Sequence, residues 1–197
     1  MLQFRVAPVR PKTLLLCSKH KNTIRLISKL LSKDVQSFLK DHHLEDPNHL
    51  LLKYRTISGL PASLVVDQLI GRRKAQERFP TWNLKENIIY PRALNLEQSS
   101  SEKSALVKVD LLKTAMGDLG NKTLLDLTGG FGVDDYFFSK AFKRVHVVEP
   151  NLDLLEIAKH NHGELGASNI DYYNMSAENF LKSTLLKSVD VIFIDPS

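Results

Sequence analysis

The stretch that most constrains the fold is Thr123–Asp135, with the sequence TLLDLTGGFGVDD. Its first residues form a short apolar run, as in a parallel strand buried on both faces, and Asp126 interrupts that run near its end. Gly129, Gly130 and Gly132 then permit positive φ angles and remove side chains, so a ligand can lie against the main chain. The stretch therefore predicts a strand, a glycine turn and a helix start. Alone, it fits a tight turn and a cofactor cradle equally well.

Two later segments favour the cofactor cradle. The run KRVHVVEP (143–150) predicts a second strand that ends at Glu149, nineteen positions after Gly130, where dinucleotide-binding folds place an acid on the ribose hydroxyls. The run VDVIFIDPS (189–197) predicts another apolar strand, which ends at Asp195. Ligands bind outside the carboxyl ends of parallel strands, so these strand-end acids predict one site at one edge of the sheet.

Taken in order, the three segments resemble class I S-adenosylmethionine-dependent methyltransferases from about Ser99 onward. DLTGGFGVD is similar to the family's glycine motif, and VVEP to its acidic second-strand motif. DPS resembles the acceptor motif of amino-group methyltransferases, which usually reads Asp or Asn, Pro, Pro and an aromatic residue. Ser197 stands at the second proline of that motif, and the sequence ends before the aromatic position. The upstream stretch 78–108, with PTW, IIYP and LEQSSSEKSA, resembles a bacterial subgroup with a helical N-terminal domain and a downstream THUMP-like, RNA-binding-like domain.

This resemblance implies a Rossmann-like α/β domain with an incomplete parallel sheet, a small all-helical domain before it, and S-adenosylmethionine as cofactor. Asp126 would take the cofactor's ammonium, the turn amides its carboxylate, and Glu149 its ribose hydroxyls. The residues expected at the cofactor are Gln98, Ser99, Asp126, Thr128, Gly129, Gly130, Gly132, Asp134, Glu149, Pro150, Ser176 and Ala177. The residues expected at the methyl acceptor are Asp195, Pro196 and Ser197, and no metal ligand is expected.

Charge is distributed unevenly along the chain. Residues 1–100 hold 17 Lys and Arg against 8 Asp and Glu, whereas residues 101–197 hold 10 against 14. A basic first half beside an acidic cofactor half indicates a polyanionic partner, with RNA the first choice, although a solvated charged surface explains it equally. Four cations crowd the end of one predicted helix and suit either phosphate contacts or the helix dipole: Arg72, Arg73, Lys74 and Arg78.

The single cysteine, Cys17, excludes a disulfide framework and a cysteine zinc site, and fits a cytoplasmic location. No apolar run approaches the roughly 18 residues of a membrane span, so no membrane partner is expected.

The sequence divides into four predicted regions: a basic, disordered tail (1–22), a helical domain (23–79), a connector (80–98) and the N-terminal part of the methyltransferase domain (99–197). Within the helical domain, apolar spacing predicts one helix from Ile24 to about His43, and two more beginning at Asp46–Pro47 and Leu60–Pro61.

The connector is too apolar for a free linker. We expect Trp82, Ile88, Ile89 and Tyr90 to pack at the domain junction, with base stacking by Trp82 or Tyr90 as the alternative. After it, the capping-box spacing of Ser99 and Glu102 predicts a helix start, and Gly120 is expected to end that helix.

Four parallel strands are predicted, joined by helices: 123–128, 144–149, 170–174 and 189–194. The family's sheet has seven strands in the order 3-2-1-4-5-7-6, so we expect an incomplete domain here. The fourth strand would be a bare edge that a missing segment or a partner covers.

Two other functions stay open beside an S-adenosylmethionine-dependent methyltransferase acting on an amino group of an RNA base. A nicotinamide-dependent oxidoreductase shares the glycine turn and the distal acid, but its third glycine would fall on Asp135, a poor residue where helix and strand pack closely. A non-catalytic RNA-binding module with a decayed cofactor fold would account for Ser197.

Overall fold

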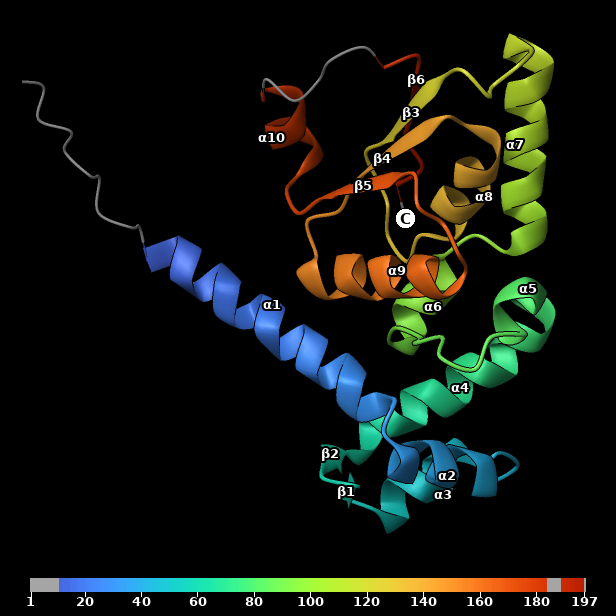
Figure 1. Cartoon of the computed structure of the whole chain (residues 1–197). Helices are drawn as coiled ribbons and strands as arrows, with labels where there is room; N and C mark the ends of the chain where they lie inside the picture. Colours follow the sequence, from blue (N-terminus) through green and yellow to red (C-terminus); the bar gives the residue numbers. More distant parts are fainter. Residues whose placement is uncertain (1–10, 184–188, 197) are drawn as a thin grey trace, which may run out of the picture.

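The computed structural model describes residues 11–183 and 189–196, with side chains from residue 20 onward. Two halves are stacked in Figure 1, a helical half below and an α/β half above. The helical half consists of α1 (Pro11–Leu30), α2 (Lys33–Asp41), α3 (Pro47–Lys53), the short hairpin β1 (Thr56–Ile57) and β2 (Leu60–Pro61), and α4 (Ala62–Arg78). Two short helices lead to the upper half, α5 (Pro80–Asn83) and α6 (Ala93–Gln98).

The α/β half alternates helices and strands. In chain order these are α7 (Glu102–Met116), β3 (Thr123–Asp126), α8 (Val133–Ala141), β4 (Arg144–Val148), α9 (Leu152–Glu164), β5 (Ile170–Tyr173), α10 (Ala177–Leu181) and β6 (Val191–Phe193). The strands are all parallel and lie in the order β5-β4-β3-β6, as predicted. Right-handed crossovers through α8 and α9 require this arrangement of neighbouring parallel strands.

Neighbouring residues of β3 face opposite sides of the sheet, as the pleat requires. Leu124 packs into a cluster with residues of α7, α8 and α9, such as Val109, Phe138 and Leu155. Leu125 packs on the other side with Phe180 of α10. Both faces of β3 are therefore buried, and the carboxyl ends of the strands remain for a site.

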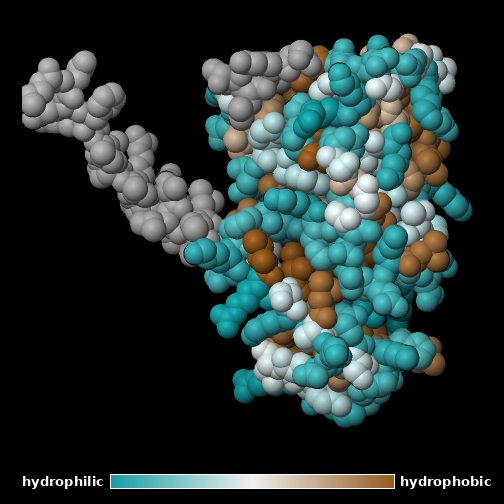
Figure 2. All heavy atoms as spheres, in the orientation of Figure 1, coloured by the Kyte–Doolittle hydropathy of each residue, from teal (hydrophilic) through white to brown (hydrophobic). Residues whose placement is uncertain are grey.

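Two side-chain amides, one from each half, hold the connector between the halves. Each forms two hydrogen bonds with the backbone of one connector residue, as a neighbouring strand would. Asn161 of α9 accepts from the Ile89 N–H (2.9 Å) and donates to the Ile89 carbonyl (2.8 Å). Gln68 of α4 pairs with the backbone of Tyr90 in the same way, at 2.9 and 2.7 Å. Figure 2 shows hydrophobic side chains gathered between the two halves of an otherwise largely hydrophilic face.

The connector packs at this junction as predicted. Trp82 is completely buried and Tyr90 is 3% exposed, so the alternative of base stacking by these rings is wrong. The connector is also less extended than predicted, because α5 and α6 form within it.

The predicted tail and first helix differ from the structure. Residues 11–22 belong to α1, where a disordered tail was expected, and residues 1–10 lie outside the described part. α1 packs on α9: the Thr23 hydroxyl donates to Asp153 (2.5 Å), and His20 Nδ1 lies 3.1 Å from a carboxylate oxygen of Glu156. Because these partners lie about 130 residues away, local sequence could not reveal them.

The predicted helix from Ile24 to His43 is broken in two at Ser32, whose backbone is extended (φ −62°, ψ 149°). The break lets Leu30, Val35 and Leu39 all enter the core of the helical half. The Leu30 carbonyl freed by the break accepts from the side chain of Gln36 at 2.7 Å.

The capping prediction for α7 was wrong by two residues. Ser101 caps the helix, because its hydroxyl accepts from the Ser104 N–H at 3.1 Å, whereas the Ser99 hydroxyl donates to the Leu96 carbonyl. Glu102 turns inward and accepts from the backbone of Trp82. The helix ends at Gly117 (φ +72°), three residues before the predicted Gly120.

None of the described helices has both the length and the hydrophobicity needed to cross a membrane.

Candidate functional site

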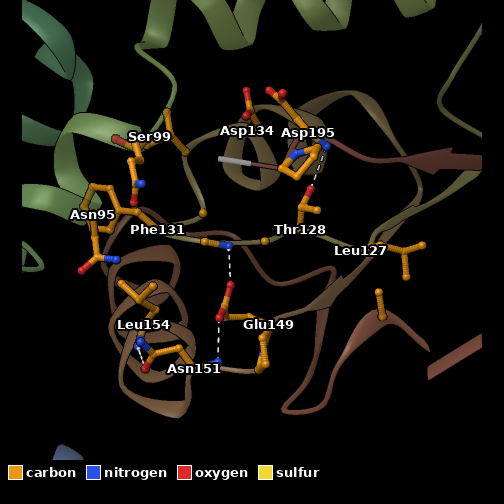
Figure 3. Close-up of a pocket in the computed structure, with 18 of the residues that line it drawn as sticks. Asn95, Ser99, Leu127, Thr128, Phe131, Asp134, Glu149, Asn151, Leu154 and Asp195 are labelled. Atoms are coloured by element: carbon orange, nitrogen blue, oxygen red, sulfur yellow. Dashed lines mark hydrogen bonds between the residues drawn. The ribbon is translucent and has the colours of Figure 1, made fainter. Parts of the chain in front are cut away.

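A cavity of about 590 Å³ opens at the carboxyl ends of the strands (Figure 3), within the usual size range of small-molecule sites. Most of the residues predicted at the cofactor line it: Gln98, Ser99, Thr128, Gly129, Gly130, Gly132, Asp134, Glu149, Pro150, Ser176 and Ala177. Asp195 and Pro196, predicted at the acceptor, line it too, whereas Ser197 lies outside the described residues. The structure thus brings these residues together, and their roles stay predictions.

The glycine turn lies too close to its neighbours to carry side chains. A Cβ at Gly129 would lie 2.4 Å from Val147 Cγ1 of β4. Gly132 has φ +84°, and a Cβ there would lie 2.8 Å from the ring of His162. These glycines therefore allow the turn to sit directly on β4 and α9, with bare backbone facing the cavity.

Glu149 is held rigidly at the end of β4. Its Oε2 accepts from the Gly130 N–H at 2.9 Å, and its Oε1 accepts from the Asn151 N–H at 2.6 Å (Figure 3). Each carboxylate oxygen can accept a second hydrogen bond, so Glu149 retains the capacity to bind a diol.

Three of the turn amides donate within the protein, and the contact of the turn with a ligand carboxylate stays a prediction. The N–H groups of Gly129, Gly130 and Gly132 donate to the Val148 carbonyl, to Glu149 and to the Gly129 carbonyl. These three donors are used within the protein, so a ligand would find mostly bare backbone and carboxylates along this wall.

Asp126 does not line the cavity, contrary to the role predicted for it. Its Oδ1 accepts from the N–H (2.6 Å) and the hydroxyl (2.9 Å) of Thr128, and burial raises the pKa of Asp126 to about 6. The carboxyl of Asp135 faces it, completely buried, and in its protonated form donates a hydrogen bond to Asp126. No described donor reaches the oxygens of the ionised Asp135. Burial and the neighbouring Asp126 raise the pKa of Asp135 well above its ordinary value. Neither carboxyl of this pair lines the cavity, so the pair lies on the other side of the glycine turn.

Asp134 lines the cavity, whereas Asp126, the carboxylate expected to bind the ammonium, does not. Its Oδ2 accepts from Lys108 Nζ (2.8 Å) and the Ser100 hydroxyl (2.7 Å). Its Oδ1 is buried, and no described residue donates to it. A buried carboxylate oxygen without a donor is costly. Asp134 also lines the cavity, so its carboxylate is available to a cationic group of a ligand.

Asp195 lies beside Asp134 in Figure 3, across the cavity from Glu149. Its backbone N–H donates to the Thr128 hydroxyl at 2.9 Å, and its Oδ2 accepts from Lys108 Nζ at 2.7 Å. Burial lowers the pKa of Lys108, but the hydrogen bonds to Asp134 and Asp195 outweigh it, and the net effect is a raised pKa. Lys108 is therefore a charged bridge between two carboxylates.

Sequence reasoning missed several residues at or next to the site, among them Asn95, Lys108, Phe131, Asn151 and Leu154. Asn151 carried a usable signal, because it follows the strand-end acid and caps α9 by accepting from the Asp153 N–H at 3.0 Å. Asn95 and Lys108 carried none, since both come from helices before the glycine turn.

The basic cluster at the end of α4 has partners within the chain. Arg72 donates to Gln36 (2.6 Å) and Lys74 pairs with Glu97 (2.6 Å). Arg73 donates to the His43 carbonyl after α2, and Arg78 to the Leu96 carbonyl in α6. None of the four lines the cavity. Their contact with phosphates stays a prediction.

In the described ranges, no three or more His, Cys, Asp or Glu side chains are arranged to hold a metal ion.

No protein-family model matches the sequence, and no curated protein matches it. Solved structures do. A candidate methyltransferase from Porphyromonas gingivalis W83 has a TM-score of 0.64 and 23% identity, over 83% of this chain and 40% of that chain. An rRNA methylase from Streptococcus thermophilus has a TM-score of 0.39 and 23% identity, over 44% of this chain and 51% of that one. Coclaurine N-methyltransferase bound to N-methylheliamine and SAH has a TM-score of 0.41 and 11% identity, over 90% of this chain and 55% of that chain.

The likeness to the Porphyromonas protein confirms the predicted Rossmann-like α/β fold. The chain described here spans 40% of the length of that protein.

Proposed function

We propose that this chain is the cofactor-binding part of an S-adenosylmethionine-dependent methyltransferase that acts on an amino group of an RNA base. The observation that carries the proposal is the charge of the cavity. Four carboxylates line it, those of Asp134, Glu149, Glu178 and Asp195, and no Lys or Arg of the described residues does. Lys108 pairs with Asp134 and Asp195 from outside the lining, so the charge around the cavity stays net negative. Such a cavity suits a ligand with cationic groups.

The residues present fit this cofactor. Asp134 offers a carboxylate at the cavity to an ammonium, and Glu149 offers a fixed carboxylate to a ribose diol. The glycine turn between them leaves the space that side chains would fill.

The same features disfavour a nicotinamide dinucleotide. Its pyrophosphate binds to free amides at a glycine turn and a helix N-terminus. Here the amides of Gly129, Gly130 and Gly132 are engaged within the chain, and Asp134 and Asp135 begin the helix. An anion placed there would meet carboxylates.

The bound cofactor supplies an electrophilic methyl group on a sulfonium. The chain's own contribution is to position the acceptor, since an in-line displacement depends on alignment. Thr128 fixes the backbone of Asp195, and the Asp195 carboxylate with the Pro196 carbonyl would accept the two N–H bonds of an amine. These contacts would point the nitrogen lone pair toward the methyl group without a strong base.

A basic surface on α1 supports RNA as the acceptor. Lys21, Arg25 and Lys29 are exposed at four-residue spacing, so they lie along one face of the helix. None of the three forms an ion pair within the described part of the chain. Unpaired cations in a row match the spaced charges of a phosphate backbone.

Isothermal titration of the chain with S-adenosylmethionine and with NADH tests the cofactor. Asp134→Asn and Glu149→Gln should each weaken S-adenosylmethionine binding by about 1.5 to 3 kcal/mol, the range for hydrogen bonds to charged groups. Asp110→Asn, an exposed change on α7, should leave it unchanged. Unaltered affinity in both site variants would overturn the assignment of the cavity. NADH binding would favour an oxidoreductase, and binding of neither ligand would favour an RNA-binding module.

The salt dependence of RNA binding tests the partner. Replacing Lys21, Arg25 and Lys29 with Gln should reduce the slope of log K against log salt by about 0.7 to 0.9 for each lost phosphate contact. A second variant with Arg72, Arg73, Lys74 and Arg78 replaced tests the cluster on α4, and Lys103→Gln on α7 is the control. Slopes equal to that of the unmodified chain in both variants would remove RNA as the partner.

A further inference from the structure

Lys108 links two carboxylates on one side of the cavity, and nothing in the local sequence marks it. We propose that Lys108 is a positioning residue, which holds the carboxylate of Asp195 in place for the methyl acceptor. The proposal rests on the methyltransferase function proposed above and adds a residue from a helix that precedes the glycine turn.

The geometry fixes the ammonium of Lys108 in a single arrangement. Nζ lies 2.7 Å from the Ser100 hydroxyl, 2.8 Å from Asp134 Oδ2 and 2.7 Å from Asp195 Oδ2. An ammonium has three N–H donors, so all three are engaged. Nζ also lies 5.2 Å from the centre of the Phe193 ring, a favourable distance for a cation and an aromatic face. Displacing Lys108 would leave two carboxylates close together without a counter-charge.

Asp195 needs this support because of its position. It follows β6, a strand of three residues at the edge of the sheet, and its side chain is 54% exposed. The Thr128 hydroxyl fixes only its backbone. Lys108, whose own side chain is 20% exposed, reaches from α7 and ties the carboxylate to Asp134 at the start of α8. The rigid core of the domain thereby fixes a side chain that would otherwise rotate in solvent.

The bridge also defines which amine fits. Lys108 engages Oδ2 of Asp195, and no described residue donates to Oδ1. One free carboxylate oxygen and the Pro196 carbonyl offer two acceptors, which match the two N–H bonds of a neutral primary amine. A tertiary or quaternary amine has no pair of N–H bonds to satisfy both acceptors, and would leave Asp195 Oδ1 without a donor from the ligand.

Amide hydrogen exchange tests the positioning without any turnover. In Lys108→Met, which keeps the apolar stem and removes the charge, the Asp195 amide should exchange about tenfold faster than in the unmodified chain. The Thr128 hydroxyl alone would then hold the segment after β6, so local opening becomes more frequent. The Leu125 amide in β3 should be unaffected. Lys108→Arg, which keeps the charge, should stay close to the unmodified chain. Equal exchange at Asp195 in Lys108→Met would overturn the proposal.

Kinetics supply the second readout. For an RNA acceptor, kcat/KM should fall about thirtyfold or more in Lys108→Met, while the Kd for S-adenosylmethionine changes less than about threefold. Lys108→Arg should recover most of the loss. Parallel losses of cofactor affinity and turnover, with no recovery by Arg, would show a merely structural role and overturn the proposal. If the unmodified chain binds no S-adenosylmethionine, the proposed function fails, and the exchange measurement still decides whether Lys108 holds Asp195.

Discussion

The Nε2 atom of His162 lies 2.7 Å from the carbonyl oxygen of Gly132, and links α9 to the glycine turn. Because a carbonyl only accepts, Nε2 carries the proton, and Nδ1 accepts from the Tyr172 hydroxyl at 2.8 Å. The ring is therefore held neutral. Its complete burial lowers the pKa of His162 to about 4, against a smaller opposing effect of the Gly132 bond. The turn that forms the cavity wall thus depends on an uncharged histidine.

Acid should destabilise the fold through this residue. Between about pH 6.5 and pH 4 the unfolded chain binds a proton at His162 that the folded chain does not, so the free energy of unfolding falls as pH falls. Relative to His162→Gln, the unmodified chain should lose about 3 kcal/mol over that range. Urea unfolding at several pH values measures the difference, in which the titration of other groups cancels. Parallel pH profiles for the two chains would contradict the buried neutral ring.

Asp135→Asn should stabilise the protein at pH 8. The buried carboxyl of Asp135 faces Asp126 without a described donor, and its raised pKa means that the folded state disfavours its ionised form. An amide there can donate to Asp126, so the free energy of unfolding should rise by about 1 to 3 kcal/mol, the usual cost of an unsatisfied buried polar group. The gain should shrink toward pH 4, where the unfolded Asp135 also takes up a proton.

Asp110→Asn, at an exposed position on α7, provides the control for this measurement and should show no such gain. Destabilisation of Asp135→Asn at pH 8 would show that the carboxylate pair contributes to the stability of the turn.

Gly132→Ala should destabilise the protein by about 2 to 3 kcal/mol, since the new methyl group combines a positive φ with a clash. Its Cβ would lie 2.8 Å from the His162 ring and 3.0 Å from the Ala158 side chain. Gly163→Ala is the matched control: it lies in α9, and no atom comes within 4 Å of its added Cβ. That change should be neutral or stabilise by about 0.5 to 1 kcal/mol, the helix preference for Ala over Gly. Thermal unfolding measures the change in stability of each variant. Equal changes in Gly132→Ala and Gly163→Ala would show that the turn tolerates a side chain.

The edge strand β6 should promote self-association. Ile192 and Ile194 are 51% and 61% exposed, and no described strand pairs with the outer side of β6. Unpaired backbone groups beside apolar side chains provide a template for further strands. Ile192→Lys should therefore shift the sedimentation profile of a concentrated sample toward the monomer. Leu52→Lys, at an 88% exposed position on α3, should have little effect. A monomeric unmodified chain, or equal effects of both changes, would exclude association through the edge.

Local sequence determined much of the α/β half. The four strands were predictable because apolar runs, strand-end acids and glycines are local signals. Their order followed from the resemblance to the methyltransferase family. The position of Glu149 at the cavity followed from the same logic, as did the start of α3 at Pro47, where Asp46 caps the helix through two backbone N–H groups.

The helix boundaries were less predictable. Ser99 and Ser101 are equally good caps in isolation, and packing of Glu102 beneath Trp82 selected the second. The break at Ser32 arose in the same way, because three apolar side chains had to reach one core. Energies of capping and propensity differ by about 1 kcal/mol or less between such alternatives, so tertiary burial decides between them.

The roles of the charged residues were set by the tertiary structure alone. Sequence placed Asp126 and Asp134 in one motif, but only the folded sheet shows that Asp126 faces Asp135 behind the turn and that Asp134 faces the cavity. Lys108 meets Asp195 across 87 positions of sequence. The sequence by itself fixed the strands, the turn and the strand-end acids, because backbone preference is a property of neighbouring residues. The structure alone decided which carboxylates pair and which remain for a ligand, because burial and charge pairing depend on residues far apart in the chain.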